Sequence, residues 1–208
     1  MAALFRDTFY GDLWVDMAFT FRAILISICF SFLIGLGIGI PLGLNAYARR
    51  VVEPVLLTLN ATPKIILFPI VLAIFKIGLA SAVVMAVIHG IFPVIINTMS
   101  ALKELKPIYL KVARISNASP WQTVWKVYIP SMILPLVTSL RLCFGLCMIG
   151  VVLAEIFASR EGLGRVIMHS YTLAKYPEMM GTLVFLYLSG MVGSLLIWKL
   201  EKVVRRIM

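Results

Sequence analysis

The sequence predicts an all-α membrane protein, a bundle of about five transmembrane helices with a pair of short helices in a cytoplasmic loop. Of the 208 residues, 62% are hydrophobic and only 13% are charged, whereas a soluble domain carries about 25% charged residues. The mean hydropathy is +1.02. The charges lie between long apolar runs rather than on one polar face. Lipid is therefore the expected solvent, around a single transmembrane domain over residues 1–208.

Apolar runs of about 20 residues, the length needed to cross a bilayer, define the spans. The expected spans lie at about 17–45, 62–76, 82–100, 131–154 and 181–200. The second is the weakest because Asn60, Pro63 and Lys64 interrupt it. We therefore expect a cytoplasmic re-entry segment at about 51–61, followed by a short span. The first span carries glycines at small-residue spacings, which allow another helix to approach closely.

The polar stretch between the third and fourth spans predicts two short helices within 103–128. Its apolar residues recur at steps of three and four from Leu102 to Ile115, the period of a helix. Ser119 and Pro120 then predict an N-cap followed by proline at the first helical position. We expect Pro130 to end the second helix before the fourth span begins.

The distribution of Lys and Arg predicts the orientation. With residues 103–126 in the cytoplasm, that side receives 12 of the 19 basic residues and the opposite side five, while Arg22 and Arg141 lie in spans. The positive-inside rule then places the C-terminus in the cytoplasm and, with five spans, the N-terminus outside. No signal peptide is evident, and the sequence leaves open whether an N-terminal helix is missing from this chain.

The net charge of +10 fits cytoplasmic loops of a membrane protein better than a nucleic-acid interface. The sequence has no phosphate-binding GxxxxGK[ST] loop, no HExxH and no nucleophile elbow. We therefore expect no enzymatic activity, cofactor, metal or nucleic-acid partner for this chain. Cys29, Cys143 and Cys147 all lie in apolar runs, which favours a packing role over a metal or redox role.

The cytoplasmic stretch resembles the coupling-loop signature of ABC importer permeases. That signature runs Glu-Ala-Ala, three residues, Gly, nine residues, Ile-x-Leu-Pro. Residues 111–119 and 127–130 keep its spacing, with Ala113 at the third position and Asn117 at the glycine, while Lys111 replaces the glutamate. The resemblance assigns an ATPase-coupling role to nine residues: Lys111, Ala113, Arg114, Asn117, Ala118, Ser119, Val127, Ile129 and Pro130.

Further stretches between Thr20 and Trp198 resemble the nitrate/taurine/sulfonate group of these permeases. They include Pro63 to Pro69, Phe92 to Thr98, and Ala154-Glu155-Ile156 with Gly162-Leu163-Gly164. The resemblance implies a type I importer fold in the bacterial inner membrane. It implies ATPase subunits that bind ATP and Mg, a second copy of this chain, an extracytoplasmic solute-binding protein, and a small anionic or polar organic solute.

Three alternatives remain open from the sequence. An ordinary amphipathic helix lying on lipid also explains the basic loop. An ion-gradient-driven secondary transporter or channel subunit would need intramembrane carboxylates for ion coupling. A structural subunit of a membrane complex would show no dependence on an ATPase.

Polar residues within the spans are the candidates for the translocation path or its gate, because charges in a membrane are costly. Two roles are open for Arg141. It is expected either to attract an anionic solute, or to pair with a helix end or with Glu155 and so hold the bundle together. Glu155, Gly162 and Gly164 belong to an outer loop that, in the resembled group, helps close the outer gate; a solvated helix-end carboxylate is the alternative. Asn97 is a further candidate, with an interhelical hydrogen bond as its alternative.

Overall fold

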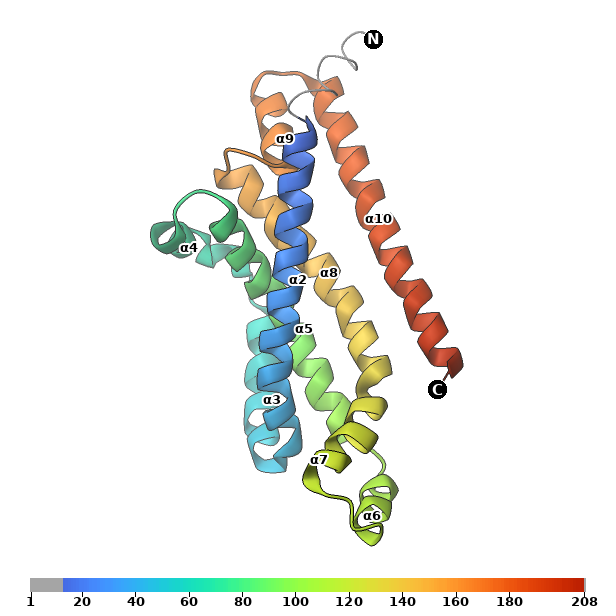
Figure 1. The fold of residues 1–208 in the computed structure, drawn as a ribbon. Helices are drawn as coiled ribbons and strands as arrows, with labels where there is room; N and C mark the ends of the chain where they lie inside the picture. Colours follow the sequence, from blue (N-terminus) through green and yellow to red (C-terminus); the bar gives the residue numbers. More distant parts are fainter. Residues whose placement is uncertain (1–12, 208) are drawn as a thin grey trace.

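Residues 13–207 are described by a computed structural model, and all of their regular structure is helical (Figure 1). The long helices are α2 (Leu13–Leu44), α5 (Leu79–Lys103), α8 (Ile129–Ala158) and α10 (Tyr176–Ile207). The shorter elements are α3 (Ala46–Ala61), the 3₁₀ helix η1 (Lys64–Leu67), α4 (Phe68–Phe75), α6 (Pro107–Ile115), α7 (Pro120–Thr123), the π-helical turn η2 (Val124–Tyr128) and α9 (Leu163–Thr172).

Four helical segments are long and apolar enough to cross a membrane. They are α2, α5, the continuous helix over Trp121–Ala158, and α10. A fifth candidate span is the pair formed by α3 and the segment Lys64–Phe75, which meet at a bend of 84°. The expected bundle of about five spans is therefore confirmed within the described residues.

Helices α2, α5 and α8 form the core, and α2 contacts α5 through a stripe of glycines. A Cβ atom on Gly35 would come within 2.7 Å of the Val94 side chain, and one on Gly39 within 2.8 Å of the Thr98 side chain. Larger residues would push the two helices apart, so these glycines permit the close contact that their spacing predicts.

The second span differs from the sequence-based expectation. Residues 51–61 belong to α3, and Leu56 packs against Ile95 and Met99 of α5. The short span expected at 62–76 contains only η1 and α4, whose 12 residues extend about 18 Å against a hydrocarbon core of about 30 Å. Proline explains the break, because Pro63 has no N–H to donate and holds the preceding residue in an extended conformation.

The expectation that Pro130 ends the second cytoplasmic helix is wrong. Helix α7, η2 and α8 continue without interruption from Trp121 to Ala158. Just before Pro130, the N–H of Ile129 donates to the carbonyl of Val124, five residues back. In an α-helix the proline ring would clash with the carbonyl of Lys126. The wider π-helical turn accommodates that ring, and the helix continues.

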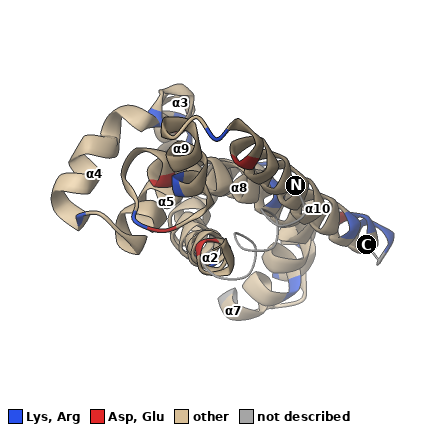
Figure 2. Ribbon diagram, turned by 90° about the horizontal axis from the view of Figure 1, so that it is seen from above, with Lys and Arg blue, Asp and Glu red and all other residues tan. Residues whose placement is uncertain are grey.

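The two ends of the bundle carry different short helices (Figure 1). Helices α6 and α7 lie at one end, where α2 also finishes, and α9 lies at the opposite end, where α2 begins. Helix α10 runs along the edge of the bundle towards the α6 end, and Figure 2 shows basic residues gathered at its C-terminal end. Only 11% of the most apolar stretch of α10 is buried.

Candidate functional site

The first candidate site is the hairpin of α6 and α7, which we call the coupling hairpin (residues 106–128). Its turn depends on Asn117, which has a left-handed φ of 49°. The N–H of Asn117 donates to the carbonyl of Arg114, and the N–H of Ala118 donates to that of Ala113. These two bonds close a Schellman turn at the end of α6, in which the left-handed residue is usually glycine and sometimes asparagine. Asn117 therefore replaces the glycine of the signature without loss of the turn.

The start of α7 is fixed by a capping box. The Ser119 hydroxyl accepts the N–H of Gln122 at 3.2 Å, and the Gln122 side chain accepts the N–H of Ser119 at 2.9 Å. Two N–H groups that would lack a partner at the helix start are thereby satisfied. The N-cap predicted from Ser119 and Pro120 is confirmed.

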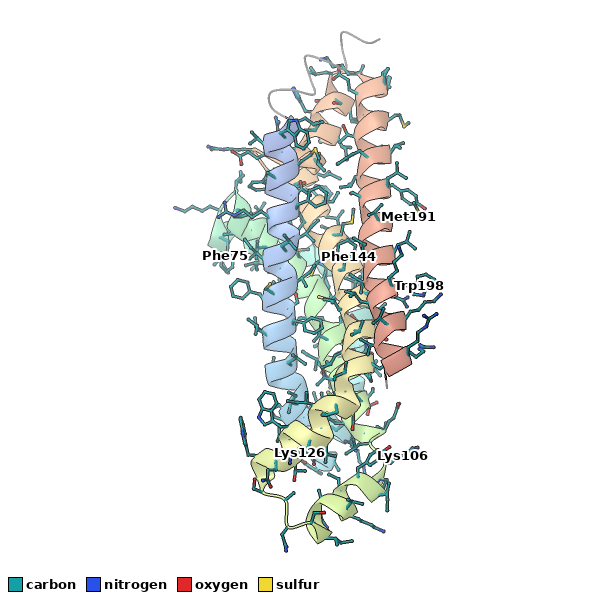
Figure 3. All side chains as sticks on the ribbon, turned by 45° about the vertical axis from the view of Figure 1, so that its right-hand side comes forward. Phe75, Lys106, Lys126, Phe144, Met191 and Trp198 are labelled. Carbon is teal, nitrogen blue, oxygen red and sulfur yellow. The ribbon has the colours of Figure 1, made fainter. Side chains whose placement is uncertain are left out.

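The exposed face of α6 is apolar and flanked by basic residues. Ile108, Val112 and Ile115 lie on one helical face and are 54%, 53% and 82% exposed. Lys111 and Arg114 are exposed beside this face. Lys106 and Lys126 lie at the same end of the molecule (Figure 3). The hairpin thus presents an uncovered apolar surface with positive charge around it.

Ala113 does not belong to that surface, because it is only 8% exposed and lies on the inner side of α6. The remaining signature residues are divided between the hairpin and α8. Asn117 and Ser119 are exposed and Ala118 is half-buried, whereas Val127, Ile129 and Pro130 belong to η2 and the first turn of α8. Trp121 and Trp125 add exposed aromatic area next to the hairpin, with their ring centroids 5.7 Å apart.

The second candidate site lies at the opposite end, where side chains from α2 and α8 hold the N-terminus of α9. Gly162, which precedes α9, has no side chain to cap the helix. Its N–H donates instead to Oδ1 of Asp16 on α2 at 2.6 Å. The other oxygen of Asp16 forms an ion pair of 2.8 Å with Arg165. Asp16 is 2% exposed, so its carboxylate acts as a buried N-cap supplied by another helix.

Thr20 and Glu155 complete this arrangement. The Thr20 hydroxyl accepts the N–H of Leu163 at 2.9 Å and lies 2.8 Å from Oε1 of Glu155. Oε2 of Glu155 accepts the N–H of Gly164 at 2.9 Å. We call the connected residues the α9 anchor: Asp16, Thr20, Glu155, Gly162, Leu163, Gly164 and Arg165. Glu155 is therefore a hydrogen-bonded buried group, since it is only 1% exposed, rather than a solvated helix end.

Both anchor glycines are required by the closeness of Glu155. A Cβ on Gly162 would come within 2.5 Å of Oε1 of Glu155, and one on Gly164 within 2.6 Å of Cβ of Glu155. Gly162 also has a φ of +107°, which side chains other than hydrogen disfavour. The sequence analysis placed Glu155, Gly162 and Gly164 in one outer loop, and in the structure both glycines are in direct contact with Glu155.

Arg141 pairs with Glu201 rather than with Glu155. Its Nη1 lies 3.5 Å from Oε2 of Glu201 on α10, and Arg205 lies 3.4 Å from the other oxygen. The Thr138 hydroxyl also donates to Glu201. The ion pair joins α8 to α10, which agrees with the expectation that Arg141 holds the bundle together. Its partner, Glu201, was not identified from the sequence.

A groove of about 390 Å³ lies between α8 and α10 next to Arg141. Its walls are mostly apolar and include Phe144, Met148, Tyr187 and Met191; Figure 3 labels Phe144 and Met191 on the two helices. Asn97, the remaining path candidate, lies half-buried on α5 and belongs to neither this groove nor the α9 anchor. The candidates expected along one path are therefore distributed over separate places.

Sequence reasoning missed Asp16, Thr20 and Arg165 as members of the anchor. A signal was present, because Asp16 and Thr20 are four residues apart on one face of the first span. It also missed Glu201, which comes directly after the last expected span at 181–200.

Within residues 13–207, no group of three or more His, Cys, Asp or Glu side chains could hold a metal ion. The sulfur atoms of Cys143 and Cys147 lie 3.7 Å apart, and both residues are fully buried beside Ala23 and Ala86. Their surroundings fit the packing role expected from the sequence.

Curated relatives cover most of this chain. It is 26% identical to the nitrate import permease protein NrtB of Leptolyngbya laminosa over 93% of this chain and 70% of the relative. It is 25% identical to the taurine transport system permease protein TauC of Escherichia coli K12 over 74% of this chain and 56% of that relative. The chain thus spans just over half to about 70% of the length of these relatives.

The fold resembles that of a solved transporter chain. Two inward-facing structures of the MetNI methionine ABC transporter match with TM-scores of 0.74 and 0.77, at 24% and 22% identity. The matches cover 91% and 92% of this chain, and 93% and 97% of the other chains. The likeness confirms the predicted importer-like helical fold.

The family model described as "Binding-protein-dependent transport system inner membrane component" matches residues 28–206. That match includes the coupling hairpin, Arg141 and most of the α9 anchor, and it confirms the family predicted from the coupling-loop signature. The chain belongs to the family of inner membrane components of binding-protein-dependent transport systems.

Proposed function

We propose that this chain is the permease subunit of an ATP-driven importer, and that the coupling hairpin is the docking site for a separate ATPase. The observation that carries the proposal is the uncovered apolar face of α6, held at a fixed angle by the Asn117 turn and the Ser119 cap. A short helix with an apolar face binds readily in a groove of a partner protein.

The hairpin is also suited to transmitting force. Because α7 passes through η2 into α8 without a break, a displacement of α7 moves the cytoplasmic end of a spanning helix directly. Closure of two ATPase subunits would draw two such hairpins together and reorient the spans between inward-facing and outward-facing states.

The remaining partners follow from the same proposal. A second copy of this chain completes the path, and an extracytoplasmic binding protein delivers the solute at the α9 end. The names of the relatives include importers of nitrate, taurine, aliphatic sulfonates and bicarbonate. They support a small anionic or polar solute for this chain.

The ion-gradient alternative is not favoured by the carboxylates in the described helices. Glu155 is occupied by Thr20 and the N–H of Gly164, and Glu201 is occupied by two arginines. Neither carboxylate is free to carry a coupling ion without loss of a contact between helices.

The substitution Ile115→Glu tests the docking site, because Ile115 is the most exposed of the three apolar residues on the α6 face. We expect normal levels of the chain in the membrane but loss of the co-purifying ATPase, since a carboxylate at an apolar interface is strongly unfavourable. Leu173→Glu is the matched control, because Leu173 is 52% exposed near the α9 end. If Ile115→Glu retains the ATPase and its stimulated hydrolysis, α6 is a lipid-lying helix and the docking proposal fails.

A further inference from the structure

A lysine lies at the break of the second span. Lys64 follows Pro63 directly, where α3 and η1 meet at the 84° bend. Its Nζ donates to the carbonyl of Asn60 at 2.7 Å and lies 3.5 Å from the Asn60 side-chain oxygen. It also lies 5.1 Å from the centroid of the Phe92 ring on α5.

The contact with Phe92 places this ammonium about midway along the length of α5. Phe92 is 13 residues after Leu79 and 11 residues before Lys103, so each end of α5 is about 17–20 Å away along the helix axis. One apolar cluster, around Leu56 and Met99, lies on the side of the α6 end. Another, around Phe68 and Met85, lies on the other side. The sequence placed Lys64 in the cytoplasm, whereas the structure places it between these two clusters.

The charge of Lys64 is not neutralised by the described part of the chain. Among residues 13–207, no carboxylate lies within 4.0 Å of its ammonium, whereas five other basic side chains form such pairs. An ammonium has three N–H donors, and Asn60 occupies one of them at short distance. The side-chain oxygen of Asn60 is a second, longer acceptor, so one of the three donors has no hydrogen-bond acceptor among the described residues.

The position of the break requires a polar or protein environment. Ala61, Thr62 and Pro63 are exposed in the single chain, and non-helical backbone at membrane depth occurs only where it is buried in protein or lines a water-filled cavity. An ionisable residue at such depth likewise faces a bundle interior or a cavity rather than lipid. Interrupted helices with this combination mark solute sites in transporters.

We propose that Lys64 determines solute specificity in this permease, by attracting a small anion to the break of the second span as the anion crosses the membrane. This inference rests on the proposed importer function and narrows its solute class to anions. The remaining N–H group of Lys64 binds the anion, the Asn60 carbonyl holds the ammonium in place, and the Phe92 ring stabilises its charge. The flanking apolar clusters provide no competing anionic group.

Charged thiol reagents test this proposal without knowledge of the solute. The complex of this chain with its ATPase is prepared in membrane vesicles, with the native cysteines replaced and Asn60→Cys as the reporter beside Lys64. Two methanethiosulfonate reagents are compared, the anionic 2-sulfonatoethyl compound and the cationic 2-(trimethylammonium)ethyl compound. The labelling rate of the anionic reagent is divided by that of the cationic reagent. The ratio cancels any effect of Lys64 on the reactivity of the thiol itself.

We expect this ratio to fall about ten-fold in Lys64→Gln, because one unit charge near the thiol attracts the first reagent and repels the second. Lys64→Arg should keep the ratio, since it keeps the charge, and glutamine can still donate to the Asn60 carbonyl. Lys76→Gln is the matched control, because it removes a lysine at the end of α4 and should change the ratio less than two-fold.

Two results would overturn the proposal. One is a ratio that Lys64→Gln leaves unchanged. The other is absence of labelling at position 60 in both the nucleotide-free and the ATP-trapped complex. In either case Lys64 only caps the C-terminus of α3. If the proposed importer function is wrong, no ATPase co-purifies with this chain. That result is separate from the labelling ratio, which can still be measured in membranes containing this chain alone.

Discussion

The hydroxyl of Thr20 lies 2.8 Å from the carboxylate of Glu155, although the two residues are 135 positions apart in the chain. Thr20 also accepts the N–H of Leu163, so one side chain connects α2, α8 and α9. The α9 anchor thereby fixes a short helix at one end of the bundle, at the position where the proposed function places the binding protein.

Thr20→Val should destabilise the protein by about 1–3 kcal/mol, because it leaves the buried Leu163 N–H without a hydrogen-bond partner and the Glu155 carboxylate with only the N–H of Gly164. Valine has nearly the same shape, so packing should be preserved. Thermal unfolding of the purified complex measures the change. Thr58→Val is the control, since that hydroxyl is exposed and bonds only within its own helix. Equal unfolding temperatures for the two variants would show that the anchor contributes nothing to stability.

Gly162→Ala should also destabilise the protein, by about 1–3 kcal/mol, because the new methyl group would overlap with Glu155 and the φ of +107° is strained for alanine. Gly181→Ala is the contrasting change, since nothing lies within 4 Å of its added Cβ and alanine favours a helix by about 1 kcal/mol. The measurement is the apparent melting temperature of each variant. A tolerated alanine at position 162 would contradict the geometry of the anchor.

Asn117→Gly should leave coupling intact, whereas Asn117→Val should impair it. The left-handed φ of 49° suits glycine and asparagine, but it costs other residues about 1–2 kcal/mol and is worst for β-branched side chains. The readout is ATPase activity stimulated by the binding protein, with the amount of this chain in the membrane as the control. Identical coupling in the two variants would show that the Schellman turn is dispensable.

Arg141→Gln should lower the stability of the complex, because it removes the interhelical ion pair of Glu201, whose side chain is only 10% exposed, and leaves only the Thr138 hydroxyl to contact it from α8. We expect about 1–2 kcal/mol, since the arginine is itself 36% exposed and partly screened. The double variant with Glu201→Gln should recover part of the loss in thermal unfolding. Normal stability with reduced solute uptake would instead assign Arg141 to the solute path.

Single cysteines test the orientation in a background without native cysteines. Lys106→Cys and Lys202→Cys should resist membrane-impermeant thiol reagents in whole cells, whereas Glu161→Cys should react. The first two positions lie towards the α6 end, and position 161 lies in the loop before α9 (Figure 1). Labelling of position 106 from outside would reverse the orientation and remove the ATPase docking site from the cytoplasm.

The amino-acid sequence by itself determined that the chain lies in a membrane, that it has about five spans, and that a pair of short helices separates the third span from the fourth. Each depends on a pattern that is local in the chain. About 20 apolar residues are needed to cross a bilayer wherever they pack, and Ser119 with Gln122 caps α7 through bonds that span only three residues. The family likewise followed from spacing within one loop, which Asn117 and Ala113 preserve.

Sequence was less informative at two prolines, Pro63 and Pro130. Pro63 breaks the second span, whereas Pro130 does not break the fourth. The ring is chemically identical in both positions. Before Pro130 the backbone widens into a π-helical turn through Val124 to Ile129, whereas Thr62 before Pro63 is extended and α3 ends there.

Only the tertiary structure decided which polar side chains in the spans meet. Asp16 and Thr20 become the cap of α9, Arg141 pairs with Glu201 instead of Glu155, and Lys64 lies about midway along α5 with no carboxylate of the described residues within 4.0 Å. A buried charge takes its role from the groups within a few ångströms of it, because desolvation makes that local pairing decide its energy. In this chain those groups come from helices up to about 150 residues apart, and no local sequence pattern specifies which of their polar side chains meet.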